Sequence, residues 1–287
     1  MTQTGWTLAG PDRSVEFAET VRPLLESSPI RNTVILGRLA TNSREPRPGD
    51  CHGWWTDDAG EVRAALLMNS PHAVVLSAGV PEQAAAALPG AWADSGRDRP
   101  TGVFGQIGIA EQVAAGWAAL TGGSYRERPK HSMRLFSFDE PTPPDPAPRG
   151  SARLATLDEV KLAVTWDLAF FEDCGIPHDG DQEPSVRARI EEGRQMMWIV
   201  DDVPVAQAAH TSPAAGVVRI TGVYTPAEHR RNGYAAGLTW AITHEVLAKG
   251  VEHVLLHTDL SNPTSNGVYQ RLGYRAVQDV TEFELTD

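Results

Sequence analysis

A proline-rich segment near the middle of the chain restricts how the rest can fold. Residues 139–150 read DEPTPPDPAPRG and hold five prolines in twelve residues. Proline lacks a backbone N–H and restricts the residue before it, so this segment cannot form a helix or a central strand. We interpret it as a semi-rigid linker. It predicts two domains, residues 1–138 and 151–287, each long enough to fold around its own core.

The charge balance and the hydropathy limit the classes of partner. The formal net charge of −12 argues against general binding to nucleic acid or to an anionic membrane surface. No stretch approaches the ~18 apolar residues of a membrane helix, and the opening MTQTGWTLAG lacks the pattern of a secretion signal. Cys51 and Cys174 have no metal-type spacing and are interpreted as unpaired thiols. We therefore expect a cytoplasmic protein without a bound metal.

The second domain predicts an α+β fold with a mostly antiparallel sheet. Its apolar residues alternate in some segments and recur at helical spacing in others, and turn residues separate these segments. The expected strands are 151–155, 196–201, 204–211, 216–225 and 252–259, followed by two closing strands at YRAV and EFEL. The expected helices begin near Val160 and cover 183–194, 233–249 and 262–273. This order is typical of an α+β domain rather than of a doubly wound fold.

The stretch EHRRNGYAAG, residues 228–237, indicates an anion site at the start of a helix. The first amides of a helix have no partner within the helix, and the helix dipole favours a negative charge there. Gly233 and Ala235 would let the backbone approach a phosphate closely. Arg230 and Arg231 would add cationic donors. Taken alone, this stretch is equally consistent with a helix that happens to begin after two basic residues.

A second stretch, downstream, makes the pattern specific. VYTPAEHRRNGYAAGL together with LHTDLSNPTSNGVYQRLGYRAV closely resembles the GNAT acyltransferase superfamily. The first matches its acyl-CoA loop as Arg230-x-x-Gly233-x-Ala235, and the second matches its helix from Asn262 to Tyr269. The resemblance covers residues 151–287. It implies acetyl-CoA as acyl donor.

The resemblance assigns roles to individual positions. It implies that Val223, Tyr224 and Thr225 end the strand whose backbone pairs with the pantetheine arm. The pyrophosphate loop would comprise Arg230, Arg231, Asn232, Gly233, Tyr234 and Ala235. Asn262 would hydrogen-bond the pantetheine arm. Tyr269 would face the thioester sulfur as general acid, because a phenol can protonate the departing thiolate; the alternative for Tyr269 is a packed core aromatic.

The general base is not assigned by the resemblance. Several family members carry a glutamate three or four positions before the valine that matches Val223, where this chain has Arg219 and Ile220. His210 near a strand end is one candidate, and a water relay to solvent is another. Glu172 and Asp173 are weaker candidates.

The first domain, residues 1–138, resembles a degenerate second GNAT copy, as in tandem GNAT proteins. Its segments follow a similar order, but VPEQAAAAL follows the strand VVLSAG, where an R-x-x-G-x-G loop would be required. It also lacks the pair of Asn and Tyr. We expect two tandem GNAT-like domains, with productive CoA binding by the C-terminal copy only.

Two classes of function follow. The first is an N-acetyltransferase that transfers acetyl from acetyl-CoA to an amine of a small molecule or peptide by direct attack. The second is a non-catalytic acyl-CoA-binding or interaction module, motivated by the missing strand glutamate. A monomer or homodimer is expected in either case.

Overall fold

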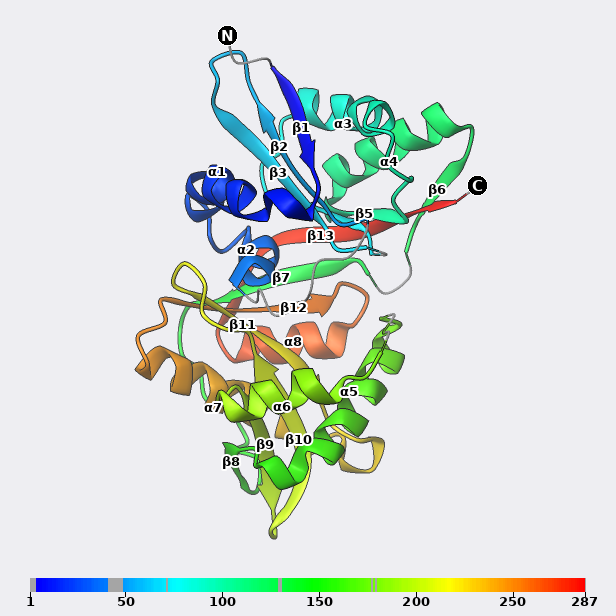
Figure 1. The fold of residues 1–287 in the computed structure, drawn as a ribbon. Helices are drawn as coiled ribbons and strands as arrows, with labels where there is room; N and C mark the ends of the chain where they lie inside the picture. The colour runs from blue at the N-terminus through cyan, green and yellow to red at the C-terminus, as the bar shows by residue number, and fades with distance from the viewer. Residues whose placement is uncertain are drawn as a thin grey trace. The chain divides into compact units, whose positions relative to one another are not determined.

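The computed structural model describes residues 4–40, 49–70, 72–128, 131–176, 178 and 180–286. Contacts divide the chain into two compact units (Figure 1). The first comprises Met1–Arg134 together with Gln278–Asp287, and the second comprises Leu135–Val277.

The first unit is an α+β domain whose described sheet has the strand order β1-β2-β3-β4-β5-β13, with β6 also paired to β13. Its strands are β1 (Gly5–Ala9), β2 (Cys51–Thr56), β3 (Val62–Met68), β4 (Val74–Leu76), β5 (Gly102–Gln106), β6 (Ser124–Glu127) and part of β13 (Tyr274–Thr286). Its helices are η1 (Pro11–Arg13), α1 (Ser14–Glu26), α2 (Thr33–Ala40), α3 (Glu82–Asp94) and α4 (Ile107–Thr121). Among the described strand pairs of this unit, β4 and β5 are the parallel one, and α3 joins them.

The core of the first unit lies between this sheet and the helices α3 and α4. Trp92 of α3 and Trp117 of α4 meet edge to face at 5.7 Å, and both are buried. Trp55 belongs to the same core, so these tryptophans serve packing. The sheet is completed by the end of the chain, because Val280–Glu284 of β13 pairs with β5.

The second unit repeats this plan, with the described strand order β7-β12-β11-β10-β9-β8. Its strands are β7 (Met133–Phe138), β8 (Ser151–Leu154), β9 (Gln195–Val200), β10 (Val203–His210), β11 (Val217–Tyr224) and β12 (His253–Asp259). Its helices are η2 (Leu157–Glu159), α5 (Val160–Cys174), α6 (Glu183–Glu191), η3 (Ala227–His229), α7 (Tyr234–Ala248) and α8 (Pro263–Arg271). Here β11 and β12 form the parallel pair, joined by α7.

Strand alternation places helices on both faces of the second sheet. Met196 and Trp198 of β9 pack with Leu238 of α7, and the same cluster includes Tyr269 of α8. Met197 points to the other face, where it packs with residues of α5 and α6. The tandem α+β fold with mixed, mostly antiparallel sheets, expected from the sequence, is confirmed.

The ends of the two units differ from the boundaries expected at 138 and 151. YRAV and EFEL form the single strand β13 rather than two strands, and residues from Gln278 onward belong to the first unit. The segment 139–150 lies within the second unit rather than between two bodies. The Asp139 amide donates to the Gly273 carbonyl at 3.1 Å, and Trp198 Nε1 donates to the Arg149 carbonyl at 2.8 Å. The segment is therefore hydrogen-bonded to the second unit at both of its ends.

Candidate functional site

An irregularity in β11 opens the sheet of the second unit. The parallel pairing of β11 and β12 is described from Val217↔His253 to Ile220↔Leu256, although both strands continue further. On the other side of β11 the register with β10 shifts, because Gln207 faces Tyr224 whereas Ala209 faces Thr221. One extra residue on β11 makes this a β-bulge. Gly222 lies in it with a left-handed φ of 60°, which a glycine adopts without strain.

The loop from β11 leads to a helix start without a capping side chain. Gly233 is the N-cap of α7 with φ 78°, and no side chain accepts a hydrogen bond from the first turn. Arg231 also lies in the left-handed region at φ 67°. Tyr234 and Ala235 form the first turn, whose amides point out of the helix end. The structure therefore has an uncapped helix N-terminus at the position where the sequence predicted an anion site.

Side chains fix this loop from within. Arg230 Nε donates to the Thr225 carbonyl at 2.9 Å, and its Nη2 lies 2.7 Å from Asp173 of α5. The guanidinium also lies 5.9 Å from the centre of the Tyr224 ring. Asn232 Nδ2 donates to the carbonyl of His229 at 3.0 Å. Arg230 therefore braces the loop, and Asp173 serves as its counter-ion in an exposed ion pair.

Helix α8 presents the predicted tyrosine and asparagine in different ways. Tyr269 is buried in the cluster that also receives Val223 and Tyr234, so the structure brings these three together. Burial, with a smaller contribution from Cys174, raises the pKa of Tyr269 to about 12. Its phenol therefore keeps its proton at neutral pH, as a general acid requires. Asn262 is exposed and caps α8, where its Oδ1 accepts from the Ser265 amide at 3.1 Å.

His210 is the last residue of β10 and does not belong to the cluster around Tyr269. Its Nδ1 is 2.9 Å from the Thr211 carbonyl, and its buried Nε2 has no partner in the described structure. Burial lowers the pKa of His210, and Glu245 and Lys249 near the end of α7 act on it with opposite signs. His210 faces Ile220, which is about 10 Å along the strand from Val223. This sealed position does not support a role in proton transfer.

A buried carboxylate beside the bulge was not predicted from the sequence. Asp167 of α5 is 4% exposed and accepts from Gln207 Nε2 at 2.8 Å. Its other oxygen accepts from Arg189 of α6. A Cβ added to Gly222 would lie 3.7 Å from Asp167 Oδ1, so the carboxylate lies directly over the bulge. An acidic residue within the apolar row that Val160 and Ala163 begin was the available signal.

Two further polar atoms near the ends of β11 and β12 are buried without a partner. They are Oγ1 of Thr225, directly after β11, and Oδ1 of Asn266 on α8. A buried polar atom without a hydrogen bond is unfavourable and is expected to have a partner when the site is in use. Both therefore mark the mouth of the opening between β11 and β12 as a surface for a polar ligand.

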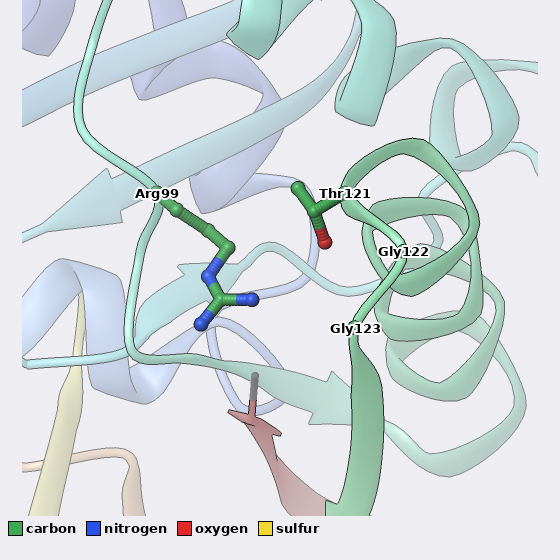
Figure 2. Close-up of a pocket in the computed structure, with 4 residues that line it drawn as sticks. All are labelled: Arg99, Thr121, Gly122 and Gly123. Atoms are coloured by element: carbon green, nitrogen blue, oxygen red, sulfur yellow. The ribbon is translucent and has the colours of Figure 1, made fainter.

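In the first unit, the helix at the equivalent place has a different start. Helix α3 follows β4 with Pro81 as N-cap and carries Glu82 in its first turn, a negative charge that disfavours an anion there. Figure 2 shows a hollow elsewhere in this unit, lined by Arg99, Thr121, Gly122 and Gly123. Arg99 Nη1 donates to the Thr286 carbonyl at 3.4 Å, and Thr121 Oγ1 donates to that of Trp117 at 2.9 Å. Both side chains are therefore hydrogen-bonded to backbone carbonyls near the C-terminal end of α4, and we assign no chemical role to this hollow.

Among the described residues, no group of three or more His, Cys, Asp or Glu could hold a metal ion. Nor does any described helix combine the length and the apolar character that crossing a membrane requires.

Comparison with known proteins shows the fold of the chain and a family resemblance of its residues 206–283. Residues 206–283, which hold the bulge, the α7 loop and α8, match the family model described as FR47-like protein. A GCN5-related N-acetyltransferase from Sphaerobacter thermophilus has a similar structure, with a TM-score of 0.63 and 16% identity, over 98% of this chain and 95% of that chain. The chain has the GNAT fold, and its residues 206–283 resemble FR47-like proteins.

The structural similarity extends beyond residues 206–283 to the tandem arrangement. A tandem GNAT protein from the clavulanic acid biosynthesis pathway aligns with 99% of this chain and 99% of its own, at 13% identity and a TM-score of 0.59. A glucosamine N-acetyltransferase region of a fungal multi-domain GH3 β-N-acetylglucosaminidase aligns with 99% of this chain and 38% of that chain, at 13% identity and a TM-score of 0.56. No curated protein sequence matches the chain. At these identities the solved structures establish the fold.

Proposed function

We propose that the chain is an N-acetyltransferase that transfers the acetyl group of acetyl-CoA to an amine of a small molecule or peptide. One observation carries the proposal. The uncapped N-terminus of α7, with Gly233 at its N-cap, follows a strand that leaves its parallel partner at a bulge. The helix start would bind the phosphates of acetyl-CoA, and the gap between the strands would receive its pantetheine arm. One continuous segment of the chain supplies both.

The residues fit CoA in detail. The first-turn amides of α7 would bind the pyrophosphate, because they lack a capping side chain. Arg231, which no described ion pair engages, would add charge from the loop. The backbone of Val223 lies beyond the last described pair with β12 and would be available to the pantetheine arm. Tyr224 pairs with Gln207 of β10, and the Thr225 carbonyl already accepts from Arg230.

The reaction follows from this placement. The amine nitrogen attacks the thioester carbonyl carbon, the C–N bond forms, and collapse of the tetrahedral intermediate breaks the C–S bond. Tyr269 donates its phenolic proton to the CoA sulfur, and the amine loses its proton to water. The proposal retains Tyr269 as general acid and does not retain His210 as base, since His210 Nε2 is sealed within the fold.

The alternative is an acyl-CoA-binding module without transferase activity. It is favoured by one observation, the presence of Arg219 and Ile220 where several GNAT proteins carry a glutamate. Asp167 supplies a carboxylate near the bulge from another element, but its oxygens already accept from Gln207 and Arg189. Measurement of turnover decides between the two.

The experiment has two stages. Calorimetry of acetyl-CoA with the full chain is expected to show one site per chain, because only the second unit has the loop. Release of free CoA thiol is then followed over a panel of amines, including amino sugars, amino acids and peptides. Binding without turnover of any amine would favour the module, whereas two sites per chain would show that the first unit also binds CoA.

A further inference from the structure

The motif asparagine of α8 is not the residue best placed to contact the pantetheine arm. Asn262 uses its Oδ1 to cap the helix, by accepting from the Ser265 amide at 3.1 Å, and the residue is exposed. The cap uses one of the two acceptor positions of this oxygen, and a ligand that displaced the cap would lower the stability of the helix.

Asn266, one turn further on, has the opposite arrangement. Its Nδ2 donates to the Asp259 carbonyl at 2.9 Å and to the Asn262 carbonyl at 2.8 Å. Two acceptors on one side fix the orientation of the amide, because a flipped amide would set oxygen against oxygen. Its Oδ1 is buried and has no partner among the described residues.

The contacts of Asn266 place its side chain beside the opening in the sheet. Its amide is held by the end of β12, where β12 continues beyond its last described pair with β11. Asn266 precedes Tyr269 by three residues, so the two lie on the same side of α8. The opening beside them is where the proposed function places the pantetheine arm.

We propose that Asn266 Oδ1 accepts a hydrogen bond from an amide N–H of the pantetheine arm, and that Asn262 acts only as the helix cap. Pantetheine carries amide N–H groups, and a fixed, desolvated acceptor recognises such a donor with little loss of side-chain freedom. The inference rests on the proposed function, since it requires that CoA binds in the second unit.

The test uses the full chain and two ligands. Asn266→Leu removes the acceptor at similar volume, and Asn262→Asp is the matched control because an aspartate retains the cap oxygen and lacks the amide donors. Calorimetry is carried out with CoA and with the adenosine bisphosphate half of CoA, which lacks the pantetheine arm. We expect Asn266→Leu to lower the affinity for CoA by about 10-fold and to leave the affinity for the bisphosphate unchanged. Asn262→Asp should leave both affinities unchanged.

Other outcomes overturn the inference. Parent-like CoA affinity of Asn266→Leu, or equal loss of both ligands by a folded variant, would show that Oδ1 does not contact the arm. Selective loss of CoA by Asn262→Asp would return the role to Asn262. Should Asn266→Leu fail to fold, Asn266→Ser provides the same comparison. A parent chain that binds neither ligand would refute the proposed function itself, and this inference with it.

Discussion

At the scale of single residues, Tyr269 combines two properties that the sequence motif alone could not separate. It is a buried aromatic, 6.2 Å from the ring of Tyr274, and its pKa is raised to about 12 by burial. A phenylalanine would keep the packing and lose the proton. We therefore expect Tyr269→Phe to reduce turnover by about 100-fold, with little change in CoA affinity or thermal stability.

The measurement for Tyr269 is the rate of CoA release at saturating acetyl-CoA, with an amine from the panel, from pH 6 to 10. Because the pKa lies near 12, the parent rate should show no decline from loss of this proton below pH 10. Equal rates of Tyr269→Phe and parent, with chemistry shown to limit the rate, would mean that Tyr269 serves packing alone.

We expect His210 to affect the free energy of unfolding rather than the rate of turnover. Burial lowers its pKa in the folded state, so the unfolded chain binds the proton more tightly. Its contribution to stability is then present above its ordinary pKa near 6.5 and is lost as the pH falls below it. We expect the free energy of unfolding of the parent to fall between pH 7 and pH 5, by up to about 1.4 kcal/mol per pH unit from this group.

The control for His210 is His210→Gln, measured by urea denaturation at the same pH values. The variant should lose the part of the slope that His210 supplies, since the other histidines are common to both proteins. Turnover within a few-fold of the parent would agree with the sealed position. A large loss of rate with an unchanged slope would instead restore His210 as the general base.

Two residues of the site, Asp167 and Asn266, could not be recognised from the sequence, and the physical reason is the same for both. Asp167 and Asn266 matter because of atoms from other elements, Gln207 and Arg189 for the first and the Asp259 carbonyl for the second. Such contacts depend on how elements pack, and no spacing along the chain encodes them. The position of Gly233 at a helix start was predictable because a helix start is a local property, whereas Tyr269 was singled out by the resemblance to GNAT proteins.

At the scale of elements, two glycines at opposite ends of α7 allow a matched comparison between substitutions at the start and at the end of the helix. Gly233 and Gly250 flank this helix with φ values of 78° and 87°. A Cβ at Gly250 would meet nothing within 4 Å, and one at Gly233 would meet only Pro148 at 3.5 Å. Asparagine tolerates the left-handed conformation better than other side chains, so either substitution adds bulk with a similar, small loss of stability.

We expect Gly233→Asn to weaken CoA by at least about 10-fold, because its side chain would stand where phosphate meets the first-turn amides. Gly250→Asn should bind CoA like the parent. Calorimetry gives both affinities, and thermal melts check that the two variants lose similar stability. Unchanged CoA affinity in folded Gly233→Asn would remove the α7 loop from the proposed site.

Most helices and strands of the second unit could be predicted, whereas their partners could not. The expected strands 196–201 and 204–211 correspond to β9 and β10, and the helix expected near Val160 is α5. EFEL was also recognised as a strand, but its place beside β5 of the first unit was not foreseen. Alternation of apolar residues defines the two faces of a strand and leaves its neighbours undetermined.

At the scale of the whole molecule, strand β13 allows a test of whether CoA binding depends on the second unit alone. Phe283 of β13 is 5% exposed in the core of the first unit, where its ring lies 5.8 Å from Tyr125. Phe283→Ala should destabilise the first unit by about 3–5 kcal/mol. The proposed CoA site lies in the second unit, so we expect CoA affinity to stay within two-fold of the parent, on the order of 0.4 kcal/mol.

Calorimetric melts with and without CoA provide the measurement. A ligand stabilises only the body that binds it, so CoA should raise the transition of the second unit, while Phe283→Ala lowers that of the first. Val277→Ala, at a position 36% exposed on the same strand, is the control and should change neither transition appreciably. A loss of CoA affinity in Phe283→Ala that matches its loss of stability would show that CoA binding depends on the first unit, against the expectation that the C-terminal copy binds it alone.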